Sequence, residues 1–144
     1  RVAVLLCAVG ALLACGGPAI SKFDETAYQK ATSLKVESLA LMDSATEPYD
    51  EHADRVRQLE AKLEKALEYA ENRPDSQIST QQWELLTDED EDLLGGFLER
   101  WENESTLNEA FVEEKKKQVR KAFDTIIDLE SGKMKSKDVQ EGQQ

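Results

Sequence analysis

The chain has 144 residues, 33% of them charged, and its 30 Asp and Glu outnumber its 18 Lys and Arg, so its formal net charge is −12 at pH 7. This acidic excess argues against a nucleic-acid partner and against docking on anionic lipid through a basic patch. With a single histidine and two cysteines, the chain also lacks the residues of most zinc sites and nucleophilic triads.

The N-terminal residues differ from everything that follows them. Residues 2–14 carry no charge and consist of Val, Ala, Leu, Cys and Gly, preceded by a positively charged Arg1. Their length fits the apolar segment of a secretory signal, roughly 7–15 residues, and is too short for a membrane-spanning helix of about 20 residues. We therefore predict a signal peptide over residues 1–14.

The apolar segment ends in Leu12-Leu13-Ala14-Cys15, which resembles the lipobox of bacterial prolipoproteins. The resemblance implies three steps: the Cys15 thiol receives a diacylglycerol, the bond between Ala14 and Cys15 is cleaved, and the new amino group is acylated. It covers the signal and nothing downstream. The alternative is an ordinary secretory signal, or a buried apolar segment, with a chance cysteine.

The lipid on Cys15 is expected to anchor the protein, because two or three acyl chains hold a protein to a membrane far more firmly than one. Cleavage removes Cys7, so the mature chain has no free cysteine for a disulfide and depends on packing for its stability. Residues 15–22 then form a lipidated tether. Gly16 fits the sorting rule of enterobacterial outer-membrane lipoproteins. We therefore expect a protein of the bacterial cell envelope, lipid-anchored in the outer membrane.

Two helices are predicted next, from apolar or small residues that recur in alternating steps of four and three. The first runs from Asp24 to Ala45, with Ser21 and Asp24 as its cap, and ends before Pro48. The second runs from Glu47 to Asn72. The recurring residues are Ala27, Ala31, Leu34, Ser38, Leu41 and Ala45 in the first, and His52, Val56, Leu59, Leu63, Ala66 and Ala70 in the second.

The region after Asn72 is predicted to be broken into short helices. Ser79 with Gln82 forms a capping box ahead of the first, and the acidic residues 88–92 begin the second. Gly95-Gly96 is expected to allow a bend in the second or a close approach of another helix. A last long helix starts at Thr106, capped against Glu109, and ends at Ser131-Gly132. The polar residues 132–144 are expected to form a disordered tail.

These elements predict an all-α fold, a small antiparallel helical bundle over residues 23–131, with about three long helices and the short pieces of 83–101 packed across it. An oligomeric coiled coil is the alternative. Sustained coiled coils need at least three or four heptads, and the regular runs here last about three and contain Ala and Ser, so an intramolecular bundle is favoured.

Three groups of residues are candidates for a site. Asp88, Asp90, Asp92 and Glu99 resemble the EF-hand calcium loop at its positions 1, 3, 5 and 12, but Leu93 and Gly95 reverse its glycine and apolar positions. The favoured interpretation is that these carboxylates lie at a helix N-terminus, where exposed N–H groups and the helix dipole stabilise negative charge. His52, with Asp50, Glu51 and Asp54 nearby, has no second nitrogen or sulfur ligand, so a core or boundary position is favoured. The third group is aromatic and either lines a ligand groove or packs in the core, of which core packing is favoured. Its members are Trp83, Phe97, Trp101 and Phe111.

The sequence therefore predicts no catalytic residues, no metal ligands and no cofactor. We expect a non-catalytic envelope lipoprotein that is held to the membrane through Cys15 and binds another envelope protein with its helical module. The alternative is a ligand- or cation-binding lipoprotein that uses the acidic and aromatic region 88–99. An enzyme acting on peptidoglycan or lipid is the third and least favoured class.

Overall fold

The computed structural model describes residues 22–134. The predicted signal peptide, the lipidation site Cys15, nearly all of the tether and most of the tail lie outside the described residues. Within 22–134 the chain forms helices and no strand. In order these are α1 (Glu25–Met42), the 3-10 turns η1 (Asp43–Thr46) and η2 (Tyr49–Glu51), α2 (Ala53–Glu71), α3 (Gln77–Thr87), α4 (Leu94–Glu104) and α5 (Glu109–Glu130).

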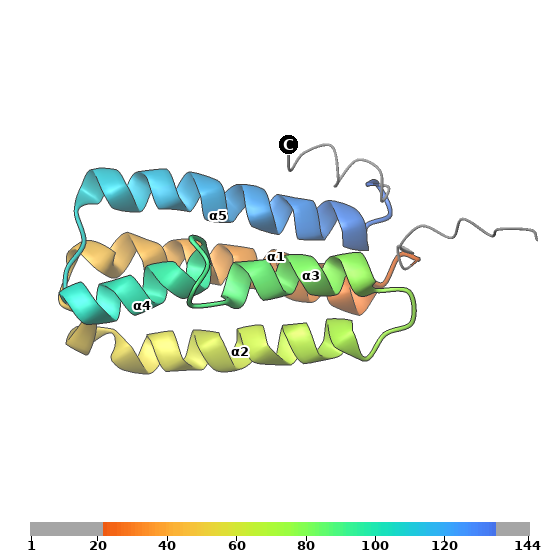
Figure 1. The fold of residues 1–144 in the computed structure, drawn as a ribbon, viewed down its shortest axis with the longest axis horizontal. Helices are drawn as coiled ribbons and strands as arrows, with labels where there is room; N and C mark the ends of the chain where they lie inside the picture. Colours follow the sequence, from red (N-terminus) through yellow and green to blue (C-terminus); the bar gives the residue numbers. More distant parts are fainter. Residues whose placement is uncertain (1–21, 135–144) are drawn as a thin grey trace, which may run out of the picture.

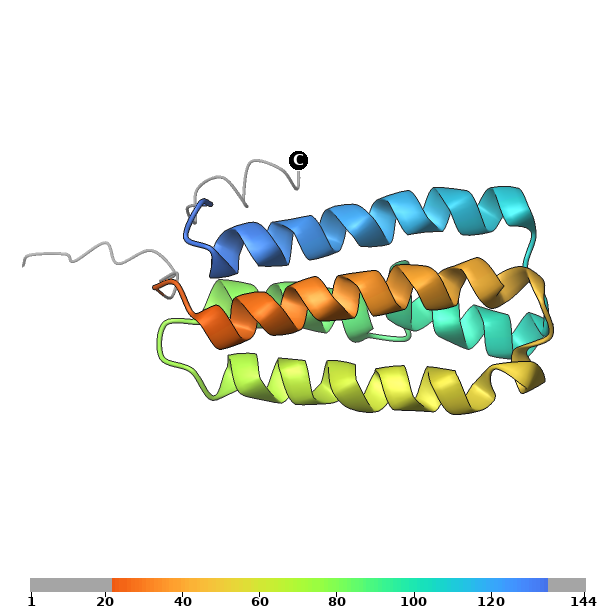
Figure 2. The same cartoon turned by 180° about the vertical axis from the view of Figure 1, so that it is seen from behind.

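The helices make a four-rod antiparallel bundle, which confirms the predicted all-α fold. The long helices α1, α2 and α5 are three of the rods, and α3 and α4 follow one another end to end as the fourth (Figures 1 and 2). Helix α1 packs against α2 and α5, and α3 packs against the same two helices. The prediction that the short pieces lie across the bundle is therefore wrong, because together they match the length of one rod.

The residues that recur in steps of four and three fill the core. All those named for the two predicted helices are buried except His52, which is partly exposed. Buried residues of α3, α4 and α5, among them Trp83, Trp101 and Phe123, complete the same cluster. Among the described residues, no helix is apolar enough over sufficient length to span a membrane.

The helix ends differ from the predicted ones by a few residues. Asp24 is the N-cap of α1, and its Oδ1 accepts from the Ala27 N–H at 2.9 Å. Asn108 rather than Thr106 caps α5, where it accepts from the N–H of Ala110 at 2.9 Å. The predicted capping box at Ser79 is wrong, since α3 begins at Gln77 and Ser79 is buried within it.

The fourth rod breaks at residues 88–93 and not at the two glycines, which lie in the first turn of α4. A Cβ on Gly95 would lie 2.3 Å from the carbonyl oxygen of Thr87, and one on Gly96 would lie 2.2 Å from that of Glu91. The glycines therefore allow α4 to start directly against the connecting backbone. Of the two roles predicted for these glycines, the bend is wrong and the close approach is confirmed.

An ion pair between Arg73 and Glu130 lies at the end of the bundle where α1 begins and α5 ends. Nη2 of Arg73 lies 2.6 Å from Oε1 of Glu130, and its Nη1 lies 3.5 Å from Oδ2 of Asp24. The Glu130 side chain is fully buried and that of Arg73 is 10% exposed. Tyr69 donates its hydroxyl to Asp24 at 3.0 Å. These contacts tie α1, α2 and α5 together.

Candidate functional site

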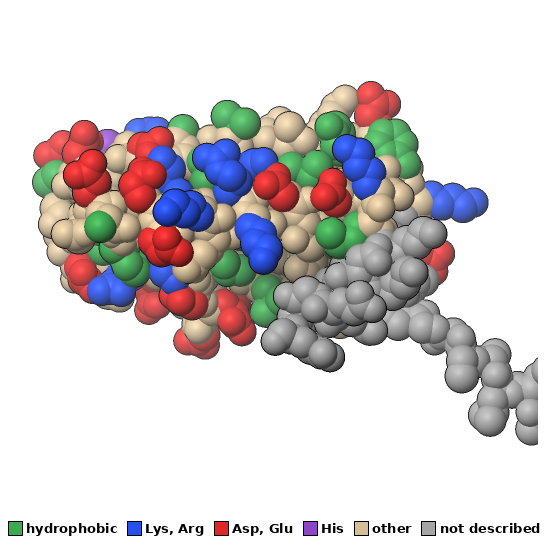
Figure 3. Space-filling model, turned by 90° about the horizontal axis from the view of Figure 1, so that it is seen from above, with side chains coloured by type: hydrophobic (Ala, Val, Ile, Leu, Met, Phe, Trp, Pro, Cys, Tyr) green, Lys and Arg blue, Asp and Glu red, His purple; other side chains and the backbone are tan. Residues whose placement is uncertain are grey.

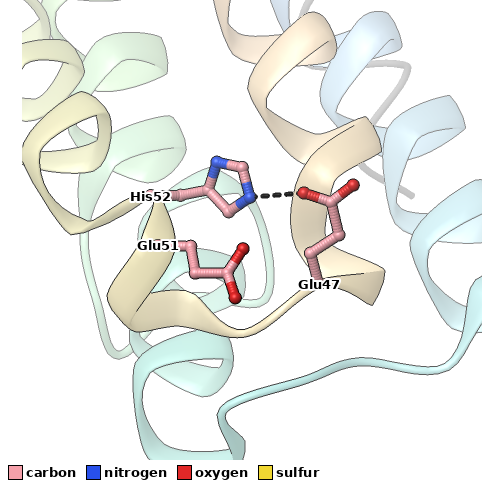
Figure 4. Close-up of side chains that lie close together, drawn as sticks. All are labelled: Glu47, Glu51 and His52. Carbon is pink, nitrogen blue, oxygen red and sulfur yellow. Dashed lines mark hydrogen bonds and ion pairs between the residues drawn. The ribbon is translucent and has the colours of Figure 1, made fainter.

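The single histidine lies in a small polar cluster at the opposite end of the bundle. Glu47 follows η1, Glu51 ends η2, and His52 precedes α2. Nε2 of His52 lies 2.6 Å from Oε2 of Glu47. One ligand-type atom from each of the three side chains lies within 4.8 Å of the others, and Figure 4 shows the Glu47 carboxylate facing the imidazole while the Glu51 carboxylate lies near both.

Aromatic packing and backbone hydrogen bonds hold this cluster in place. The His52 ring lies 5.5 Å from the Trp101 ring, and Tyr49 meets Trp101 edge to face at the same distance. The Trp101 indole N–H donates to the carbonyl oxygen of Glu47 at 3.0 Å. The backbone N–H of Tyr49 donates to the carbonyl of Ser105 at 2.8 Å. The turn between α1 and α2 is thus fixed on α4.

The cluster offers one nitrogen and two carboxylates, whereas structural zinc sites have four protein ligands and catalytic sites commonly include more nitrogen or sulfur. The direct contact between Glu47 and His52 already accounts for the placement of both side chains. Of the acidic residues expected near His52, the structure brings Glu51 into the cluster, and it adds Glu47, which sequence reasoning missed. The predicted second helix included Glu47, but α2 begins only at Ala53, and a separation of five residues from His52 is not one that a helix brings face to face.

The acidic segment 88–92 does not form a metal centre with Glu99. Asp88 accepts a hydrogen bond from the N–H of Asp90 at 2.9 Å, which stabilises the turn. Asp92 lies 2.5 Å from the ammonium group of Lys115. Within residues 22–134, Glu47, Glu51 and His52 are the sole group of three with spacing suited to a metal ion. The segment connects α3 to α4, but the first turn of α4 holds no acidic residue and its N-cap, Leu93, makes no side-chain cap, so the expected role of these carboxylates at a helix N-terminus is not borne out.

The aromatic residues pack in the core and form no groove in the described part of the chain. Trp83, Phe97 and Trp101 are at most 2% exposed. Phe111 is partly exposed, and its ring stacks on that of Phe97 with centroids 6.2 Å apart. The preference for core packing is therefore confirmed.

A groove that sequence reasoning did not find lies between α2 and the break in the fourth rod. It has a volume of about 500 Å³. We call it the junction groove, and we use "floor" for its apolar lining residues and "rim" for its polar ones, which are mostly charged. The floor consists of Ala61, Leu63, Leu67, Gly95 and Leu98, and the rim of Arg57, Glu60, Glu64, Thr87 and Glu89.

The rim of the junction groove is acidic. Burial, together with the nearby charges of Glu89 and Glu102, raises the pKa of Glu60, and the positive charge of Arg57 only partly opposes this. The guanidinium of Arg57 pairs with Asp54 one turn earlier. The carboxylates of the rim therefore repel one another. The sequence of α2 does not reveal this repulsion, because Glu89 belongs to the segment between α3 and α4 and lies near Glu60 only in the folded bundle.

Comparison with family models, with curated proteins and with solved structures found no match to this chain. Its function has to be inferred from its own residues, among which the junction groove and the Glu47–Glu51–His52 cluster are the two candidates.

Proposed function

We propose that this chain is a bacterial lipoprotein, anchored in the cell envelope through lipid on Cys15, whose helical bundle binds another protein and catalyses no reaction. The observation that carries the binding role is the junction groove, which combines leucine side chains with charged neighbours at the surface. Interfaces commonly have this composition, an apolar centre within a polar rim. Gly16 after the lipidated cysteine supports the outer membrane as its location.

The periodic apolar faces of the helices do not offer a surface for the partner. The apolar stripes of α1 and α2 pack inside the bundle, so they are not free to receive a helix from another protein. In the junction groove, by contrast, Leu67 is only partly buried, and it lies beside the exposed Glu64. A partner is therefore expected at this groove.

The use of the sole histidine supports a non-catalytic role. His52 contacts Glu47 and packs against Trp101, and these contacts fix the turn between α1 and α2.

The anchor is tested by metabolic labelling with an alkyne fatty acid in a bacterial host. We expect label on the wild type and on Cys7→Ala, the matched control, because Cys7 is removed with the signal peptide. Cys15→Ala is expected to carry none. Label retained on Cys15→Ala would refute the lipidation site.

The binding role is tested by in-cell crosslinking followed by affinity capture of the full-length protein and of Cys15→Ala. We expect discrete envelope proteins with the wild type that are lost or depleted with the variant. Recovery of nothing above background from the wild type would refute a protein-binding role.

A further inference from the structure

The acidic side chains of the junction groove have no salt-bridge partner. No salt bridge within residues 22–134 involves Glu60, Glu64 or Glu89, although the bundle holds many others. On α5, for comparison, Lys115, Lys116 and Lys117 all have acidic partners. Figure 3 shows this face, with Lys and Arg side chains lying among those of Asp and Glu.

Beside these unpaired carboxylates, the floor of the groove is made of apolar side chains. Leu63 and Leu98 are each 3% exposed and make the bottom of the groove, and Leu67 is partly exposed at its side. An apolar side chain entering the groove would be removed from water, and a cation beside it would relieve the repulsion among the carboxylates. A ligand that satisfies both features has to be amphipathic and basic.

The dimensions fit a short helix. The lining residues of α2 extend from Arg57 to Leu67, which corresponds to about 15 Å along a helix at 1.5 Å per residue. A partner helix laid along α2 would therefore contact the groove over roughly ten residues, or three turns. Helices that bind grooves in this way present apolar residues at spacings of three and four, with polar residues alongside.

We infer that the junction groove binds a basic amphipathic helix of a partner protein, with Lys or Arg side chains against Glu60 and Glu89 and apolar side chains on Leu67 and Leu98. This inference rests on the proposed function and names the surface and the chemistry of the partner.

The test is site-specific photocrosslinking of the full-length protein in cells. A photoreactive phenylalanine analogue replaces Ala61 in the groove or, as a matched control, the exposed Lys121 on α5. We expect a crosslinked partner from position 61 only. The crosslinked peptide, identified by mass spectrometry, is expected to carry Lys or Arg within about four residues of the attachment point, which is one helical turn.

A charge variant then tests the acidic rim. Glu60→Gln with Glu89→Gln is expected to lower the crosslink yield from position 61 roughly three- to tenfold, since two exposed ion pairs are lost. Glu113→Gln with Glu114→Gln on α5 removes the same charge and is expected to change nothing. Both variants are expected to remain folded, and the melting temperature of the Glu60 and Glu89 variant is expected at or slightly above that of the wild type, since it removes the repulsion within the rim.

The results separate this inference from the proposed function. Crosslinks from position 121 alone would overturn the groove and leave protein binding intact. A partner peptide without basic residues, or a yield unchanged by the Glu60 and Glu89 variant, would overturn the chemistry. A crosslink to Lys135 or Lys137 of the same chain, or to a second copy, would assign the groove to that occupant. No protein crosslinked from either position and none captured from the wild type would overturn both.

Discussion

The buried ion pair between Arg73 and Glu130 gives the sharpest test of the bundle's energetics. Arg73→Met removes the cation and leaves the Glu130 carboxylate, which is fully buried, without its charged partner. Breaking a buried pair from one side costs about 3–5 kcal/mol. The free energy of unfolding of a domain this size is about 5–15 kcal/mol, so the loss is a large part of the total. At several degrees per kcal/mol, we expect the melting temperature to fall by roughly 10 °C or more.

The assay is urea and thermal unfolding followed by circular dichroism, with two comparisons. Arg100→Met removes one partner of a pair with Glu104 in which both side chains are about half exposed, and it is expected to cost less than about 1 kcal/mol. Arg73→Met with Glu130→Met replaces both charges by apolar side chains, which is often close to neutral for a buried pair. The reasoning is refuted if Arg73→Met costs no more than Arg100→Met, or if the double variant is less stable than Arg73→Met alone.

Three further predictions concern other parts of the molecule. Gly95→Ala places a Cβ 2.3 Å from the Thr87 carbonyl oxygen, so chemical denaturation is expected to show a loss of about 1–3 kcal/mol; an unchanged midpoint would contradict the packing of α4 on the connecting segment. Burial raises the pKa of Asp24, but hydrogen bonds from Ala27 and Tyr69 and the charge of Arg73 lower it on balance below its ordinary value of 3.8. The Asp24 carboxylate therefore stabilises the fold above pH 3.8, and this stabilisation is lost as the pH falls through the lowered pKa. We measure the stability difference between the wild type and Asp24→Asn by urea unfolding from pH 7 to pH 2 and expect it to shrink below about pH 4. A difference that stays constant with pH would contradict this. Calorimetric titration with Ca²⁺ or Mg²⁺ is expected to give no heat of specific binding, because the acidic residues of 88–92 do not converge with Glu99; saturable heat abolished by Asp90→Asn would contradict it.

The fold could be predicted from the sequence because it depends on periodicity. The steps of four and three in α1 and α2 mark the buried faces, and the polar stretches at Pro48 and Pro74 mark the turns. Helix starts were less accurate, since a capping side chain is chosen by tertiary contacts. The backbone N–H of Leu107, for example, donates to the carbonyl of Ala45 at 2.8 Å, which fixes the chain past Thr106 and leaves Asn108 to cap α5.

The candidate sites could not be predicted because they join residues from different elements. Glu60 lies on a helix face that looks like ordinary solvent-exposed surface until Glu89 is brought beside it. Gly95 and Gly96 are compatible with a bend or with a close approach of two backbone segments, and only the packing of α4 on the connecting segment shows that the close approach applies. Glu47 reaches His52 across a proline. Each of these relations is set by packing between helices, and no local pattern records it.

Because the bundle has an even number of antiparallel rods, α1 begins and α5 ends at the same end of the bundle. The backbone N–H of Asp24 lies 3.5 Å from the carbonyl oxygen of Glu130, so the first and last helices meet at one end, and the α4–α5 loop at Ser105–Asn108 occupies the other, about 30 Å away by the length of α5. Under the proposed anchor, a reporter inserted directly after Met134 would be held close to the bilayer. A reporter inserted in the α4–α5 loop would stand at the outer tip, so the pair would measure which way the bundle points from the membrane.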